Sequence, residues 1–197
     1  MRKNFEIHLI AAVLVLSLSM AAFAGTDLSE IRLERPIAVT TCGQSPGALM
    51  AGLVFTRAGL ENYHNDLLTA EILQERAAQG EGFKALFITT GTSMKGMGAA
   101  GTDINDEIDR ISSLIAEAKK QGIYVMGAHI EGAARRVDHT DQLSVEAVCQ
   151  HADMLVVIES SDEDGYFTKL AAERNVPLLK VKETLHLMEP FQNLFEQ

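Results

Sequence analysis

Five short apolar runs, each rich in β-branched residues, alternate with longer segments of helical character. The runs cover residues 36–42, 84–90, 123–130, 154–160 and 177–181. Strands that are apolar along their whole length, rather than at every second residue, are typical of a parallel sheet with helices on both faces. The alternation therefore predicts a three-layer, doubly wound α/β domain with a mostly parallel sheet.

A weaker strand at residues 62–65 would bring the sheet to five or six strands. Because crossovers between parallel strands are right-handed, the simplest arrangement is the flavodoxin-like order 2-1-3-4-5, with room for a sixth strand. Further helices are expected at residues 46–58, 69–79, 140–151, 164–174 and 184–195.

The clearest helix is expected at residues 103–121. Thr102 or Asp103 can cap its start, and Gly122 can end it. Apolar side chains recur on one face of this segment, at Ile104, Ile108, Ile111, Ile115 and Ala118.

The first 24 residues have the pattern of a secretory signal. Arg2 and Lys3 precede an apolar run at residues 9–22, which ends in the small-residue pattern Ala22-Phe23-Ala24. We expect cleavage after Ala24, a polar leader at residues 25–35 and a single domain at residues 36–197. The protein would then be periplasmic or extracellular; the alternative is an uncleaved N-terminal anchor.

The net charge of −10 is that of an acidic protein. Such a chain is a poor ligand for nucleic acid or for anionic membrane surfaces, so we expect neither partner once the signal is removed.

The predicted strand order places the connections after the first and third strands side by side, where the winding direction changes. Open α/β proteins usually bind their ligands in that crevice. Ser45 precedes Pro46 and predicts a helix cap, whereas Gln44 has no such duty and is the better candidate for ligand contact. The third strand is followed by a glycine-rich loop at residues 89–103, with Thr90 and Ser93 near the strand end and Lys95 as its cation.

Two nucleotide motifs fail in this loop. Gly96 to Gly101 match G-x-G-x-x-G, but they begin several residues beyond the strand, and the predicted helix starts only after the last glycine. Gly91 and Gly96 have the outer spacing of a P-loop without the Lys-Ser/Thr that should follow. We therefore predict no cofactor. A carboxylate or other anion could still use Lys95 and the backbone N–H groups around Gly96 and Gly98. The alternative is a glycine-rich turn that only lets helices pack.

A second polar cluster follows the fourth strand. Arg135 and Arg136 carry guanidinium groups suited to a carboxylate or phosphate, and His129 and Glu131 lie just before them. Structurally, the arginines could instead neutralise Glu131 or nearby aspartates, and His129 could be a core histidine. The spacing of the histidines matches no metal site, so none is predicted.

Two cysteines are expected at opposite edges of the sheet, too far apart for a disulfide. We expect Cys149 to be a buried residue of a helix. Cys42 lies at the ligand edge and could be a nucleophile if a base such as His129 were within reach; Ser93 is the other candidate.

Four strings occur in this order behind the signal-like segment: PIAVTTCGQSPGALM, GTSMKGMGAAGTDINDEI, GAHIEGAARR and DEDGYFTKLA. Their combination resembles the exported bacterial proteins grouped as domain-of-unknown-function family 6305, over nearly the whole mature chain. The resemblance implies an exported α/β domain and no particular reaction. It also implies a small residue where this chain has Cys42, which argues against a cysteine nucleophile shared by the family.

Three functions are compatible with the sequence. The first is binding of a small, anionic metabolite by Gln44, Thr90, Ser93, Lys95, Gly96, Gly98, His129, Glu131, Arg135 and Arg136. The second is a periplasmic hydrolase or transferase, which requires Cys42 or Ser93 within hydrogen-bond reach of His129. The third is a protein-interaction module for a membrane-protein partner, which requires an exposed apolar patch.

Overall fold

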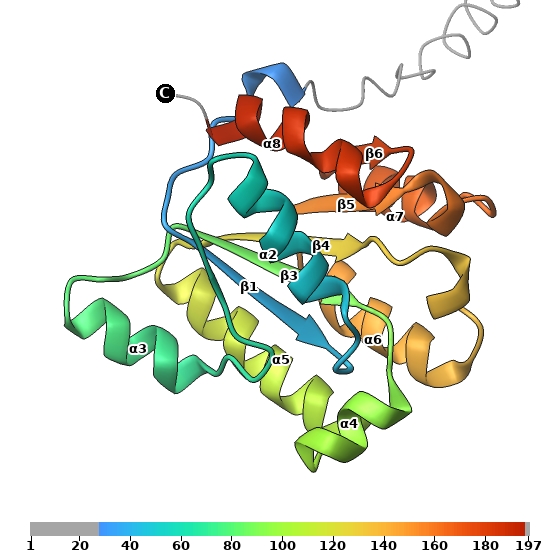
Figure 1. Ribbon diagram of the computed structural model, residues 1–197, viewed down its shortest axis with the longest axis horizontal. Coiled ribbons are helices and arrows are strands. Elements are labelled where there is room, and N and C mark those ends of the chain that lie inside the picture. Colours follow the sequence, from blue (N-terminus) through green and yellow to red (C-terminus); the bar gives the residue numbers. More distant parts are fainter. Residues whose placement is uncertain (1–27, 196–197) are drawn as a thin grey trace, which may run out of the picture.

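The computed structural model describes residues 28–195. It contains one sheet of six parallel strands in the order β2-β1-β3-β4-β5-β6 (Figure 1). The strands are β1 (Ile37–Cys42), β2 (Asn62–His64), β3 (Ala85–Thr90), β4 (Tyr124–His129), β5 (Met154–Ile158) and β6 (Leu178–Val181). The predicted α/β class and order are confirmed, with β6 as the sixth strand. The expected segment 1–24 lies outside the described residues.

The central strands are buried on both faces. All six residues of β1 and all six of β3 are buried, and alternate residues of each strand enter two separate cores. Ile37 and Val39 belong to one core, and Ala38 and Cys42 to the other. Continuous apolar runs are required because the sheet has no solvent-facing side at its centre.

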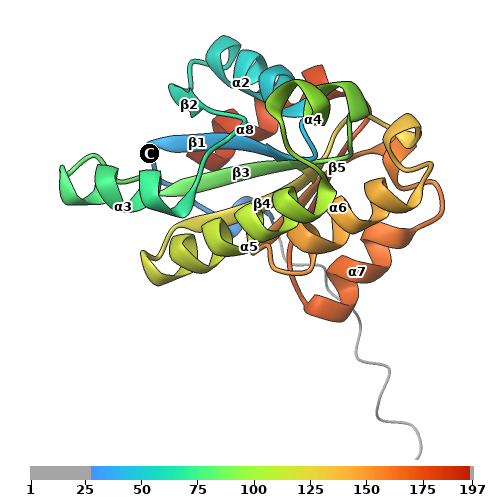
Figure 2. The same cartoon turned by 90° about the horizontal axis from the view of Figure 1, so that it is seen from below.

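Helices α2 and α8 cover one face, while α3, α5, α6 and α7 cover the other (Figures 1 and 2). Helix α4 lies at the start of α5 (Figure 1). The bounds are α2 (Gly47–Arg57), α3 (Ala70–Ala78), α4 (Met94–Ala100), α5 (Ile104–Lys120), α6 (His139–Cys149), α7 (Tyr166–Arg174) and α8 (Met188–Phe195). Short 3₁₀ turns form η1 (Leu28–Glu30), η2 (Ala133–Arg135), η3 (Glu159–Ser161) and η4 (Thr184–Leu187).

Helix α5 begins as its sequence predicts, and Ile111, Ile115 and Ala118 of the expected face are buried. Asp103 caps its start in a capping box with Asp106, and Gly122 follows its end with a positive φ of 72°. Ile104 and Ile108, expected on the buried face, are only half-buried. Glu107 is buried instead, in line with Ile111 and Leu114.

Residues 28–33 of the expected leader pack on the domain. Leu33 is buried, and its backbone N–H donates to the carbonyl of Leu194 in α8 (2.7 Å). Leu28 and Ile31 pack against the same core. Within residues 28–195, no helix is both long enough and apolar enough to cross a membrane.

Candidate functional site

The connections after β1 and β3 meet at the switch in winding direction, but they are joined to each other. Gln44 and Thr92 form an isolated antiparallel bridge, and the Ser93 N–H donates to the Gly43 carbonyl (2.8 Å). A Cβ on Gly96 would lie 2.1 Å from the carbonyl oxygen of Gln44. The expected crevice is therefore filled by backbone at this point, and Gly96 serves close packing.

The glycine-rich segment is not a loop throughout, which corrects the sequence prediction. Residues 94–100 form α4, and the side chain of Ser93 caps this helix by accepting a hydrogen bond from the Gly96 N–H (3.0 Å). Gly101, with a φ of 70°, ends it. Glycines at positions 96 and 98 are poor helix formers, which hid the helix from pattern reasoning.

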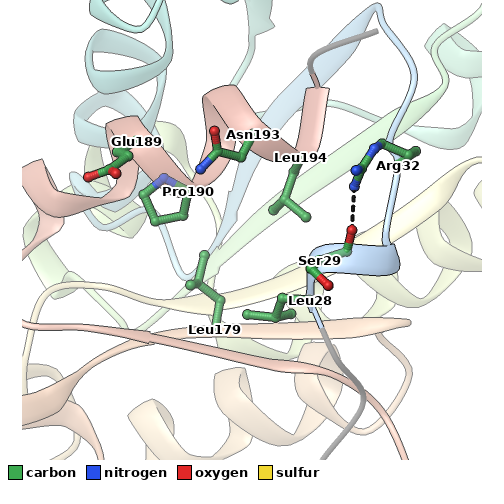
Figure 3. Close-up of a pocket in the computed structure, with 8 residues that line it drawn as sticks. All are labelled: Leu28, Ser29, Arg32, Leu179, Glu189, Pro190, Asn193 and Leu194. Carbon is green, nitrogen blue, oxygen red and sulfur yellow. Dashed lines mark hydrogen bonds between the residues drawn. The ribbon is translucent and has the colours of Figure 1, made fainter.

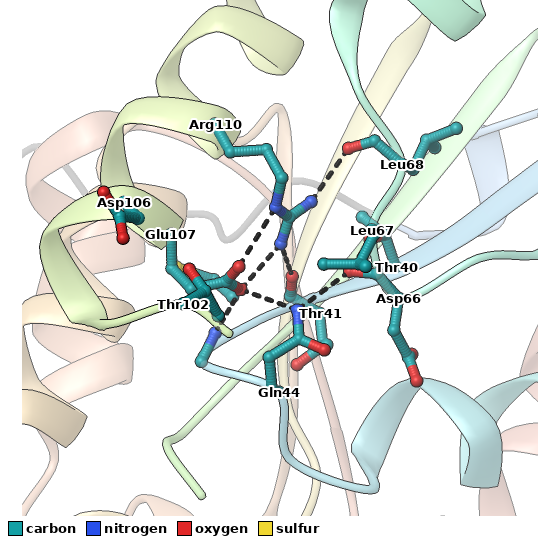
Figure 4. Close-up of polar contacts among 12 residues, drawn as sticks. Thr40, Thr41, Gln44, Asp66, Leu67, Leu68, Thr102, Asp106, Glu107 and Arg110 are labelled. Carbon is teal, nitrogen blue, oxygen red and sulfur yellow. Dashed lines mark hydrogen bonds and ion pairs between the residues drawn. The ribbon is translucent and has the colours of Figure 1, made fainter. Parts of the chain in front are cut away.

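Glu107 and Arg110 of α5 hold the β1 connection in place, and sequence reasoning missed both roles (Figure 4). The carboxylate of Glu107, only 1% exposed, accepts hydrogen bonds from the Gly43 N–H (2.9 Å) and from Gln44 Nε2 (3.0 Å), and it pairs with Arg110 (2.7 Å). Arg110 also donates to the carbonyls of Thr41 (2.6 Å) and Leu68 (2.8 Å). One feature of the sequence could have indicated the role of Glu107. It lies one turn before Ile111, on the apolar side of an amphipathic helix, where a glutamate must be paired if it is buried.

Gln44 is committed to the same network. Its Nε2 also donates to the carbonyl of Asp66 (3.1 Å), so both amide hydrogens have partners, and its backbone has a positive φ of 57°. The residue expected to contact a ligand therefore ties β1 to the connection after β2.

Two side chains of α6, also missed, fix the connection after β3. Asp141 accepts hydrogen bonds from the Thr92 N–H (2.8 Å), the Thr92 hydroxyl (2.7 Å) and the Val137 N–H (3.1 Å). Ser144 accepts from the Gly91 N–H (3.0 Å) and donates to the Cys42 carbonyl (2.5 Å). Both are buried, so the edge of the sheet is held by buried polar contacts.

His129 is a buried core histidine whose nitrogens have other partners. Nδ1 lies 2.9 Å from the hydroxyl of Thr90, Nε2 lies 3.3 Å from the Gly132 carbonyl, and the ring stacks on Phe167. Burial lowers the pKa of His129 to about 4, so the ring is neutral at pH 7.

Neither candidate nucleophile is paired with His129 in the described structure. Cys42 is fully buried, and this burial raises the pKa of its thiol to about 12. Ser93 is occupied as a helix cap. Cys149 is likewise a buried free thiol. The hydrolase alternative thus lacks the contact that it requires.

The polar cluster after β4 is mostly occupied by internal contacts. Glu131 accepts a hydrogen bond from the Gly47 N–H (2.9 Å) at the start of α2 and pairs with Arg135 (3.4 Å). Arg135 also donates to the Thr92 carbonyl (2.6 Å). The carboxylate of Glu131 therefore binds the N-terminus of α2, the role that was expected for the Ser45 side chain.

Arg136 forms a two-pronged pair with Asp164 (2.9 and 3.0 Å) and lies over the rings of Tyr166 and Phe167. The structural interpretation of both arginines fits the geometry, although Asp164 was not among the partners considered.

Lys95 and Gly98 are the remaining candidates. Both are exposed, a Cβ on Gly98 would meet open space, and Lys95 has no hydrogen bond or ion pair with any residue in 28–195. The described residues also contain no group of three or more His, Cys, Asp or Glu side chains that could hold a metal ion.

A family model described as "Domain of unknown function (DUF6305)" matches residues 34–195. The chain belongs to this family. A comparison with curated proteins gives no match for this DUF6305 protein.

Three solved structures with a similar backbone fold are a protein of the G-D-S-L family, PdxK and an esterase. A G-D-S-L family protein from Desulfitobacterium hafniense is 14% identical, with a TM-score of 0.35, covering 80% of this chain and 97% of that one. PdxK from Plasmodium falciparum, solved with AMP-PNP and PL, is 13% identical, with a TM-score of 0.41, covering 83% and 61%. The esterase EstA from Pseudoalteromonas is 10% identical, with a TM-score of 0.32, covering 73% and 76%. These likenesses carry no argument about activity in the DUF6305 protein.

Seven large apolar side chains are exposed in the described domain. All seven lie in segments that follow the carboxyl end of a strand: Leu49, Met50, Leu53, Leu67, Met94, Val137 and Leu185. The connections at the amino edge of the sheet expose none within residues 28–195. Apolar side chains at an edge where loops converge are typical of a binding surface.

We call six of these residues the apolar rim: Leu49, Met50, Leu53, Leu67, Met94 and Val137. Leu67 follows Asp66, whose carbonyl bonds to Gln44. Met94 is two residues from Gly96, which packs on the Gln44 carbonyl. Val137 and Thr92 share the carboxylate of Asp141. These contacts place Leu67, Met94 and Val137 beside the joined connections, and the other three rim residues lie in α2, which follows the β1 connection.

Proposed function

We propose that this domain binds a partner protein through the apolar rim at the carboxyl edge of its sheet. The observation that carries the proposal is the exposure of large apolar side chains beside the joined connections, where Met94 and Val137 are 73% and 74% exposed. Leaving such groups in water forgoes about 25 cal/mol for each Å² that burial would remove from solvent. A partner would recover this free energy.

The rigidity of the rim supports the proposal. The segments that carry Leu67 and Met94 are tied to Gln44, and the buried carboxylates of Glu107 and Asp141 fix the connections beneath them. A surface that is already ordered loses little conformational entropy on binding.

Charge suggests the chemistry of the partner. Lys95 is exposed beside Met94 and has no pairing partner among the described residues. A complementary surface would present apolar side chains around a carboxylate. A second copy of this chain suits the rim poorly, because association would bring together two molecules with a net charge of −10 each.

The other expected functions have less support. Of the three cationic residues expected to bind an anionic metabolite, only Lys95 and the exposed part of Arg135 lack full partners within residues 28–195, and an enzyme would need a nucleophile beside His129. Because the N-terminal sequence predicts export, we propose that the partner is extracytoplasmic, with a membrane protein included.

Site-specific photocrosslinking tests the proposal. The chain is expressed from Met1 in its natural host with a benzophenone amino acid at Met94, and at Lys120 as the control, since Lys120 is exposed at the far end of α5. We expect one protein to crosslink from Met94 and not from Lys120. Lys95→Glu should lower the yield, whereas Lys119→Glu should leave it unchanged.

With the crosslinked protein purified, Met94→Glu should raise its Kd at least about fivefold, since a central apolar contact at an interface is worth more than about 1 kcal/mol. Identical crosslinking from both positions, or an unchanged Kd, would refute the rim as a binding surface. A rise in melting temperature with citrate that Lys95→Ala abolishes would favour the metabolite instead.

A further inference from the structure

A groove of about 960 Å³ lies between η1, α8 and the edge strand β6, and none of its lining residues belongs to the rim (Figure 3). Its apolar lining is formed by Leu28, Leu179, Pro190 and Leu194, of which Leu179 and Leu194 are mostly buried in the core, at 6% and 4% exposed. The volume is at the upper end of small-ligand sites, so a single amino acid would leave most of it empty. The groove is therefore suited to an elongated molecule with an apolar middle.

Opposite charges stand at the two ends of this groove, with the leucines between them (Figure 3). Arg32 lies at one end, where its Nη1 donates to the carbonyls of Ser29 (2.7 Å) and Ile31 (2.8 Å), and it forms no ion pair with a described residue. Glu189 lies at the other end and has no hydrogen-bond or ion-pair partner within residues 28–195. A bound molecule with a carboxylate at one end and an ammonium at the other would satisfy both.

Polar groups that suit peptide bonds lie along the same groove. The amide of Asn193 has no hydrogen bond to any described residue, and it can both donate and accept. Strand β6 is the edge of the sheet, and apart from its ladder with β5, residues 178–181 make no backbone hydrogen bond to other described residues. Edge strands and free amides are the groups with which proteins hold extended peptides.

We propose that this groove binds a short apolar peptide with free termini, its carboxylate at Arg32 and its ammonium at Glu189. The groove shares no residue with the apolar rim, so an experiment that refutes one proposal leaves the other standing. The volume of the groove limits the length of the peptide, and the leucines favour apolar side chains. The charges of Arg32 and Glu189 determine which terminus lies at which end.

Isothermal titration of the full-length protein with the tripeptide Leu-Ala-Leu tests the proposal. The N-acetylated and C-amidated forms should each bind about two- to fivefold more weakly, as expected for the loss of one exposed ion pair. Glu189→Gln should erase the effect of acetylation alone, and Arg32→Gln should erase the effect of amidation alone. Both side chains are exposed, so the variants should fold.

Two further variants separate the groove from the rest of the surface. Asn193→Trp should fill the groove and abolish binding, whereas Glu183→Gln, an exposed change outside the lining residues, should not alter it. The proposal is overturned if the tripeptide does not bind, if the blocked forms bind as well as the free one, or if Asn193→Trp leaves the affinity intact.

Discussion

Replacing Glu107 by Gln should destabilise the domain more than any comparable surface change. The carboxylate accepts two hydrogen bonds from the β1 connection and two from Arg110, whose side chain is only 12% exposed. The amide keeps the size of the side chain but leaves the guanidinium without a countercharge. Breaking a buried pair in this way typically costs about 3–5 kcal/mol. For a domain of this size, that corresponds to a fall in Tm of roughly 6–20 °C.

Urea unfolding followed by far-UV circular dichroism measures this loss. A matched control is Lys169→Gln, which breaks an ion pair between side chains that are 77% and 61% exposed and should cost less than about 0.5 kcal/mol. The double variant Glu107→Gln/Arg110→Gln should lose less than the sum of its single changes, because no uncompensated charge then remains.

Two results would refute this reasoning. One is a loss below about 1 kcal/mol for Glu107→Gln, which would mean that water solvates Arg110 as well as the carboxylate does. The other is strict additivity in the double variant, which would mean that the two side chains do not interact.

Three further predictions concern the glycines, the buried histidine and the thiols. Gly96→Ala should lower Tm through a backbone clash costing about 1–3 kcal/mol, whereas Gly98→Ala, in the same helix but facing open space, should raise stability by up to about 1 kcal/mol; thermal unfolding of both variants decides this. His129 binds its proton in the unfolded chain near pH 6.5 but in the folded chain only near pH 4, so stability should fall by about 3 kcal/mol as pH drops through this window. His129→Gln should lose that part of the pH dependence, as measured by urea unfolding between pH 7 and pH 4; an unchanged slope would contradict it. Cys42 and Cys149, with pKa values raised to about 12, should not react with a thiol reagent at pH 8 until the protein is unfolded, and rapid labelling of the native protein would show the burial to be wrong.

Local patterns were sufficient for the sheet and for most helix ends. The apolar runs around β1 and β3 have no polar face, which requires helices on both sides of a parallel sheet. The capping box of α5 and the glycine that ends it involve residues within a few positions of each other. Such signals predicted the order of the strands, with β2 recognised from only a weak run.

The candidate site could be predicted only in part. Its location at the switch point followed from the strand order, but the roles of its residues did not. Gln44 and Glu107 are 63 positions apart, and Gly91 and Ser144 are 53 positions apart. No local pattern shows that two such residues will meet, so polar side chains expected to face a ligand prove to hold the connections together.

The sequence by itself determined the α/β class and the acidic charge, because each depends on composition or on neighbours along the chain, and the handedness of crossovers was enough to predict the strand order. Only the tertiary structure decided which polar groups are satisfied internally and which apolar groups remain exposed. Arg136 turns to Asp164, while Met94 and Val137 stay in water. The physical reason is that exposure and pairing depend on what packs against a residue in space, and in a doubly wound fold those neighbours come from distant segments.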